Sequence, residues 1–163
     1  MNNFLWSHLS LIVFLLLATK LGLQFYLNFR QKKHVYSHRP SVPQAFALHI
    51  GIEEHQKAAD YTIAKIAFAN INLLIEFFVT LIWLYAGGFA LLERTVMSLS
   101  NAPIFQGLLF FGLIGLISTF INLPLSYYQT FVLEEKFGFN KTNLKTFLSD
   151  LLKQLLLTFL LGG

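Results

Sequence analysis

Cysteine is absent from this sequence of 163 residues, and charged residues are scarce. Without cysteine, the sequence can form no disulfide bond, thiolate nucleophile or cysteine-ligated metal site. Charged residues account for 12% of the chain, roughly half their share in an average soluble domain. Hydrophobic residues account for 55% and are collected in long blocks. The sequence is therefore predicted to be an integral membrane protein.

The positive charges are few and do not form a tail. The net charge is +4, with lysines and arginines distributed over short connecting segments. This distribution is typical of the charge bias that sets membrane topology, and it predicts no nucleic-acid partner. The 18 phenylalanines suit helix surfaces that face lipid, so the bilayer is the first predicted partner.

Four apolar blocks organise the chain. At ~1.5 Å rise per residue, the first three are long enough to cross a hydrocarbon core of ~30 Å. The fourth begins as an amphipathic helix from Leu144 and is too short to cross. The predicted fold is therefore all-α and polytopic, with 1–163 forming the N-terminal transmembrane domain of a longer protein. The predicted spans are about 4–27, 66–92, 104–128 and, incomplete, 151–163.

The first block could also be a cleaved signal peptide. A signal peptide begins with positive charge and ends at a small-residue cleavage site. Here the chain begins with the uncharged Met1-Asn2-Asn3, and the block runs into Tyr26 and Arg30. An uncleaved span is therefore favoured.

The connections between the blocks indicate the orientation of the chain. The connections 28–65 and 129–150 are separated by two spans and both carry cations, whereas the polar turn 93–103 has one arginine balanced by one glutamate. The positive-inside rule places both cationic connections in the cytoplasm and the N-terminus outside or in the lumen. Within the first connection, a helix is predicted over 53–65.

Four polar side chains lie inside the apolar blocks, namely Asn70, Asn72, Glu76 and Asn122. One interpretation is that they hold helices together by interhelical hydrogen bonds. The other is that they line a water-filled chamber, because an ionisable group in a span normally faces such a space. The two interpretations are about equally supported, and Glu76 favours the chamber.

The histidines do not complete a metal site. His34 and His38 have the spacing of the zinc motif His-Glu-x-x-His, but Val35 occupies the position of the catalytic glutamate. A solvated, basic loop beside the membrane is the favoured interpretation. His49 and His55 are too far apart for the motif. No catalytic residue and no metal ligand is predicted in this chain.

The most specific segment is 130–142, Thr-Phe-Val-Leu-Glu-Glu-Lys-Phe-Gly-Phe-Asn-Lys-Thr. Gly138 between two phenylalanines predicts a tight turn that places both rings at the membrane interface. With Pro124 and Tyr128 upstream, the segment resembles a loop of the integral-membrane zinc metalloendopeptidases that act as CAAX prenyl proteases. The stretch 53–65 and the order of the spans resemble the N-terminal region of the same family.

The resemblance implies a ring of membrane helices around a hydrated chamber, with zinc bound in the full-length protein by later sequence. It implies as partners the C-terminal zinc protease domain of the same polypeptide and a peptide or protein substrate, including prenylated ones. The segment after the third span would pack beside the zinc domain. Its residues are Glu134, Glu135, Lys136, Phe137, Gly138, Phe139, Asn140, Lys141 and Thr142.

The predicted function is a non-catalytic N-terminal membrane module of such a protease, inactive alone, that forms chamber wall and substrate-access scaffold. One alternative is a small non-enzymatic membrane protein, a transporter or an assembly factor. Another is a lipid-binding role for the basic connection, carried by Arg30, Lys32, Lys33 and Arg39. The short connections favour a bacterial cytoplasmic membrane, with the endoplasmic reticulum as the location in a eukaryote.

Overall fold

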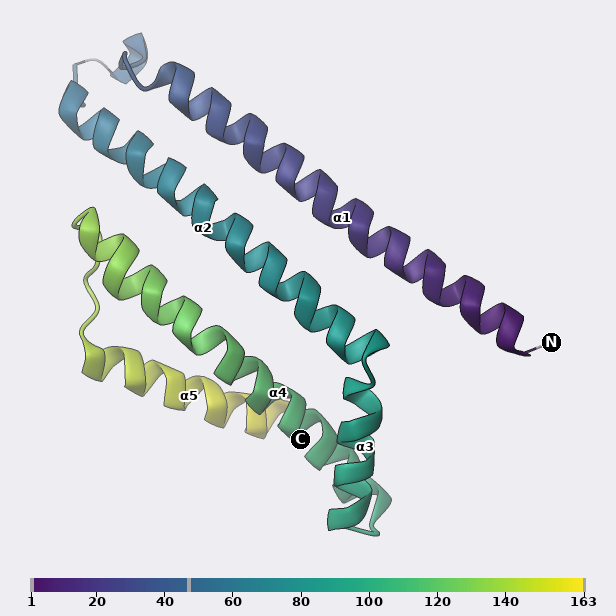
Figure 1. The fold of residues 1–163 in the computed structure, drawn as a ribbon. Helices are drawn as coiled ribbons and strands as arrows, with labels where there is room; N and C mark the ends of the chain where they lie inside the picture. Colours follow the sequence, from purple (N-terminus) through teal and green to yellow (C-terminus); the bar gives the residue numbers. More distant parts are fainter. Residues whose placement is uncertain (1, 47, 163) are drawn as a thin grey trace. The chain divides into compact units, whose positions relative to one another are not determined.

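Figure 1 shows the protein as a computed structural model that describes residues 2–46 and 48–162. Within these residues the chain is helical and has no strand, which confirms the all-α prediction. It divides into two compact units, 1–79 and 80–163, which are described separately. The elements are α1 (Asn2–His38), η1 (Gln44–Phe46), α2 (Ile52–Tyr85), α3 (Gly88–Leu99), α4 (Pro103–Tyr128), the π-helical η2 (Gln129–Glu134) and α5 (Leu144–Gly162).

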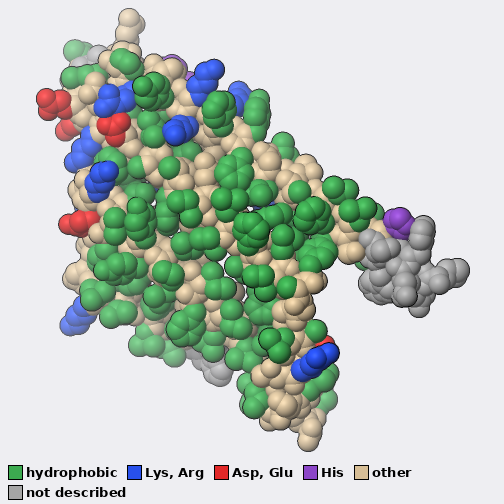
Figure 2. Space-filling view, viewed as in Figure 1, with side chains coloured by type: hydrophobic (Ala, Val, Ile, Leu, Met, Phe, Trp, Pro, Cys, Tyr) green, Lys and Arg blue, Asp and Glu red, His purple; other side chains and the backbone are tan. Residues whose placement is uncertain are grey.

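Three helical stretches are long and apolar enough to cross a membrane within the described residues. They are His8–His38, Ile52–Tyr85 and Pro103–Glu134. Hydrophobic side chains cover most of the surface visible in Figure 2, as expected where the surrounding medium is hydrocarbon. The protein is therefore an integral membrane protein with three membrane-length helices, as the sequence predicts.

The connection predicted over 28–65 is mostly helical in the structure, which corrects its interpretation as a loop. Helix α1 continues to His38 and α2 begins at Ile52, so that only 39–51 lies between them. Nothing before Pro40 interrupts the helix, and the residue before a proline is disfavoured in helical geometry. The predicted helix over 53–65 is confirmed as the start of α2, with two glutamates in its first turn, where the helix dipole favours negative charge.

The helix that carries the second span ends earlier than the predicted boundary at residue 92. Gly87 adopts φ +81°, a left-handed conformation that cannot continue an α-helix. A Cβ on the next residue, Gly88, would lie 2.8 Å from the Trp83 ring. The chain therefore breaks after Tyr85, and the polar turn predicted over 93–103 falls largely within a separate helix, α3.

In the first unit, α1 runs antiparallel to the part of α2 that belongs to it (Figure 1). Side-chain contacts join them at separate points. Phe14 and Phe77 have ring centroids 6.4 Å apart, and Asn28 donates from Nδ2 to Asn70 Oδ1 over 2.6 Å. The two helices are therefore linked at separated points along their length.

In the second unit, α4 packs against α3, η2 and α5. The ring of Phe89 lies 6.2 Å from that of Phe110, which joins α3 to α4. Tyr127, Phe131 and Phe147 form a second cluster that joins α4, η2 and α5, with centroid separations of 4.9 to 6.4 Å. This unit is therefore held by aromatic packing.

Candidate functional site

A polar cleft of about 310 Å³ lies between α4 and α5, within the second unit. Ser118, Asn122 and Ser126 are four residues apart along α4, so they share one face of an otherwise apolar helix. The facing helix α5 contributes Asp150 and Gln154. The full lining is Ser118, Thr119, Asn122, Leu123, Ser126, Phe147, Asp150, Leu151 and Gln154.

Two of the polar side chains of α4 that line the cleft donate a hydrogen bond within their own helix. Thr119 Oγ1 donates to the carbonyl oxygen of Gly115 over 2.8 Å, and Asn122 Nδ2 donates to that of Ser118 over 2.9 Å. Their oxygen atoms can accept further bonds. Across the cleft, Asp150 Oδ1 accepts from Lys153 Nζ over 3.2 Å. The cleft therefore presents both acceptors and donors, since Ser118, Ser126 and Gln154 also line it, and it suits water and other polar ligands.

The four predicted chamber residues are divided between the two units. Asn122 lines the cleft, whereas Asn70 is bonded to Asn28 across the first helix pair. Asn72 and Glu76 are one turn apart on α2, a continuous helix there, and therefore share a face. Asn72 Oδ1 is buried and has no partner among the described residues. An unbonded buried amide oxygen is costly, so this atom requires water or another donor.

The segment after α4 forms a compact helix C-cap. Gly138 has φ +70°, which a glycine adopts without the steric penalty that other residues incur. The N–H of Phe139 donates to the carbonyl of Glu134, and the N–H of Gly138 donates to that of Glu135, both over 2.9 Å. These two bonds are the pair of a Schellman motif. The tight turn predicted at Gly138 is thus present.

The residues that follow this cap start α5. Asn140 Oδ1 accepts from the N–H of Thr142 over 2.7 Å, and Asn140 Nδ2 donates to Glu135 Oε2 over 2.8 Å. Asn143 Oδ1 then accepts from the N–H of Thr146 over 2.8 Å, as an N-cap does. The specific sequence of this segment is therefore explained locally by two successive caps that reverse the chain.

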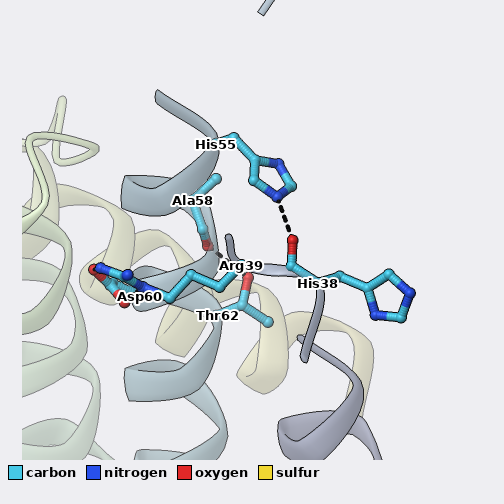
Figure 3. Close-up of polar contacts among 6 residues, drawn as sticks. All are labelled: His38, Arg39, His55, Ala58, Asp60 and Thr62. Carbon is cyan, nitrogen blue, oxygen red and sulfur yellow. Dashed lines mark hydrogen bonds and ion pairs between the residues drawn. The ribbon is translucent and has the colours of Figure 1, made fainter. Parts of the chain in front are cut away.

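A polar clamp closes the end of the first helix pair (Figure 3). The Arg39 guanidinium donates to both carboxylate oxygens of Asp60, over 2.7 and 2.8 Å. This hydrogen bonding raises the pKa of Arg39 above its ordinary value. His55 Nε2 donates to the carbonyl oxygen of His38 over 2.9 Å. Sequence reasoning missed the clamp, because its members are about twenty residues apart and belong to no motif.

The histidines do not fit a zinc site. His34 and His38 lie on helix α1 and not in a loop, with ring centroids 4.2 Å apart. His38 Nδ1 lies 2.9 Å from the carbonyl oxygen of His34, which occupies that nitrogen. No group of three potential metal ligands exists in the described part of the chain, and a protein zinc site needs at least three.

Several lining residues could not be identified in advance. Ser118, Ser126, Asp150 and Gln154 line the cleft, but none forms a motif with the others. The four-residue spacing of Ser118, Asn122 and Ser126 is the pattern from which a polar face on α4 could be predicted. The partner residues on α5 become visible only once the two caps have turned α5 back along α4 (Figure 1).

Comparison with known proteins gives consistent matches. Residues 31–163 match the sequence profile of the family described as CAAX prenyl protease N-terminal, five membrane helices. The chain is 32% identical over 148 residues to CAAX prenyl protease 1 of Saccharomyces cerevisiae, covering 85% of this chain and 32% of that protein. It is 33% identical over 156 residues to the probable CAAX prenyl protease 1 of Schizosaccharomyces pombe, covering 87% and 32%.

A solved structure agrees with these matches. The crystal structure of S. mikatae Ste24p superposes with a TM-score of 0.85 at 32% sequence identity, covering 94% of this chain and 36% of that chain. The chain spans about a third of the length of the curated relatives it matches.

Proposed function

The chain belongs to the CAAX prenyl protease N-terminal family, and from this we propose that it is the non-catalytic membrane module of a zinc metalloendopeptidase. It forms chamber wall and substrate-access scaffold for proteolysis in or near the membrane. Among the residues that the structure describes, no group of three potential metal ligands is found. In this proposal, zinc and the hydrolysis that depends on it belong to the C-terminal protease domain of the same polypeptide.

The polar cleft between α4 and α5 is the observation that carries this proposal. Polar side chains on a membrane-length helix normally face protein or water, because hydrocarbon offers them no partner. Here they face a hollow of about 310 Å³ whose other wall carries a carboxylate and an amide. A hydrated wall of this kind can hold the backbone of an extended peptide through its N–H groups.

The capped turn at 134–142 serves as the docking element for the protease domain in this proposal. Its backbone is fixed by the cap at Gly138, so it can present its surface with little loss of conformational entropy. The substrate is a peptide or protein. A prenylated CAAX peptide suits a eukaryotic enzyme, whereas a misfolded or hydrophobic membrane peptide suits a bacterial one.

The proposed topology places the N-terminus outside or in the lumen, and both cationic connections in the cytoplasm. Asn70, Asn72, Glu76 and Asn122 remain the candidates for lining the chamber. We place the protein in a bacterial cytoplasmic membrane because its connections are short, and in the endoplasmic reticulum if the source is eukaryotic.

The substitution Asn122→Leu in the full-length protein tests the cleft. In this proposal, the substitution removes one neutral hydrogen bond between the Asn122 amide and the bound peptide. Such a bond contributes about 1 kcal/mol, so its loss would lower kcat/KM on the order of fivefold. Phe120→Leu is the control, since Phe120 is 74% exposed and lies on the other side of α4. Cleavage is measured with a farnesylated CAAX peptide and with an unprenylated hydrophobic peptide. Equal activity of both variants would contradict a role of the cleft in proteolysis.

Elemental analysis separates the module from the alternatives. The full-length protein is expected to bind one zinc per chain, and residues 1–163 alone none. Stoichiometric zinc on the short chain would contradict the assignment. A full-length protein that binds no zinc and cleaves neither peptide would favour the non-enzymatic alternative, a transporter or an assembly factor.

A further inference from the structure

Four cations lie near one level of the α1–α2 pair. Asn28 is bonded to Asn70, and further along the pair Arg39 is bonded to Asp60. The two helices run antiparallel, so a step forward along α1 corresponds to a step back along α2. Lys33 lies five residues after Asn28, and Lys65 lies five residues before Asn70. These two lysines are therefore at the same level of the pair. Two more cations of α1 lie within one turn of this level. We call the four the basic belt: Arg30, Lys32, Lys33 and Lys65.

The belt has no carboxylate to neutralise it. All four side chains are exposed, and none forms an ion pair in the part of the chain that the structure describes. Arg39, one of the four cations expected from sequence to act together, is instead engaged by Asp60. Lys65 from α2 takes its place. The belt is therefore a ring of positive charge, unpaired among the described residues, at one level of two helices, with Arg30 and Lys33 on a shared face of α1.

Aromatic side chains accompany the belt on α1. Tyr26, Phe29 and Tyr36 are 57%, 64% and 70% exposed. The Arg30 guanidinium lies 5.9 Å from the ring centroid of Tyr26, and Lys65 Nζ lies 5.7 Å from that of Tyr61 on α2. Aromatic rings beside cations are typical of the zone where a membrane helix leaves the hydrocarbon.

The apolar length of α1 agrees with this position. From Leu9 to Phe29 the helix is largely apolar, about 31 Å at the rise of an α-helix, which matches the thickness of the hydrocarbon core. In Figure 2 the corresponding part of α1 is covered by hydrophobic side chains, and Lys and Arg side chains gather beyond it. If the segment from Leu9 to Phe29 fills the hydrocarbon core, the belt lies at the depth of the lipid phosphates.

We propose that the basic belt binds the phosphate of anionic phospholipids in the leaflet it faces. A lysine or arginine near a membrane surface is attracted to anionic lipid, and neighbouring guanidinium and ammonium groups can donate to one phosphate. The tyrosine rings hold the cations at headgroup depth. The inference concerns a surface other than the α4–α5 cleft and does not depend on proteolysis.

The test uses the full-length protein in nanodiscs of phosphatidylcholine that contain a minor fraction of phosphatidylglycerol. Native mass spectrometry counts the retained lipids of each class. Wild type is expected to enrich phosphatidylglycerol. Arg30→Gln with Lys33→Gln should lower this preference on the order of tenfold. The matched control removes the same charge elsewhere, Lys141→Gln with Lys145→Gln, and should retain the preference.

Two further variants keep the test independent of folding. The pair Arg30→Lys with Lys33→Arg preserves the charge and should keep the preference, whereas Lys32→Gln with Lys65→Gln should lower it. Thermal unfolding in detergent checks that every variant is folded. Wild-type protein without a preference, or a belt variant that matches wild type, would overturn the proposal. Displacement of the lipid by millimolar glycerol 3-phosphate would also overturn it, since the site would then bind soluble phosphate.

Discussion

The two units of this membrane protein use their polar residues differently. In the first unit, Asn28 and Asn70 bond to each other across two helices, so each satisfies the other. In the second, Asn122 bonds to the backbone of its own helix and lines a cleft. Asparagines look alike in sequence, yet one pair joins two helices and the other residue lines a cleft.

The side-chain packing that holds each unit together also differs between the two units. The first helix pair is joined at separate points by a ring contact and by polar pairs. The second unit has an aromatic cluster of Tyr127, Phe131 and Phe147 and a fixed turn at Gly138. A unit held by aromatic packing and caps can keep a cleft open without losing its fold. Substitutions should therefore have different consequences in the two units.

Gly138→Val should have the largest effect on stability. A β-branched residue in the left-handed conformation costs roughly 1–2 kcal/mol, and Gly138 has φ +70°. The matched control is Gly22→Ala in α1, where a Cβ would meet nothing within 4 Å; it should be neutral or stabilising by roughly 0.5–1 kcal/mol. Thermal unfolding in detergent measures both. Equal destabilisation would show that the turn is not fixed.

Asn70→Leu should have the second-largest effect on stability. It removes the bond from Asn28 and leaves that amide without its partner in the membrane, at a cost of about 1 kcal/mol. In the double variant with Asn28→Leu, the loss should be smaller than the two single losses combined, because both remove one interaction. Denaturant titration measures the cycle. Additive losses would mean that the two asparagines act independently.

Comparing Asn122→Leu with Asn70→Leu tests whether the asparagines of the two units have different roles. Its amide bonds within one helix, so the substitution breaks no interhelical contact. We expect a stability loss of less than about 0.5 kcal/mol, measured in the same titration. A loss as large as that of Asn70→Leu would place Asn122 in helix packing and remove the difference between the units.

Arg39→Gln should also have a small effect. The ion pair with Asp60 is bidentate, but its side chains are 36% and 43% exposed, and such exposed pairs contribute little. A decrease of about one or two degrees in the unfolding midpoint is expected, smaller at high salt. A decrease comparable to that of Asn70→Leu would show that the clamp is a main attachment between α1 and α2.

The sequence predicts the long helices well and the interruptions less well. The apolar blocks indicate where the long helices run. The predicted second span continues to residue 92, although the helix ends before Gly87. Helix α3 is predicted in part as a polar turn, because Glu93 and Arg94 suggest solvent more than helix. Helical continuation of α1 to His38 was missed for the same reason.

The site is predicted only in part. Gly138 between two phenylalanines indicates a tight turn, and the local hydrogen bonds explain it. Asn122 was identified because a polar residue in a span is costly. Asp150 and Gln154, which line the same cleft, are not predicted from the sequence. They face Asn122 only because the chain reverses between α4 and α5, and the pairing of the two helix faces depends on contacts between residues distant in sequence.

Water access along α4 tests the central claim most directly. The chain contains no cysteine, so single cysteines can be introduced at Ser118, Asn122 and Ser126, and at Leu116 and Phe120 as controls, in a full-length protein otherwise free of cysteine. A maleimide that reacts with thiols only in water should label the first three and leave the controls unlabelled. Equal labelling at all five positions, or none at the first three, would contradict a hydrated face on this helix.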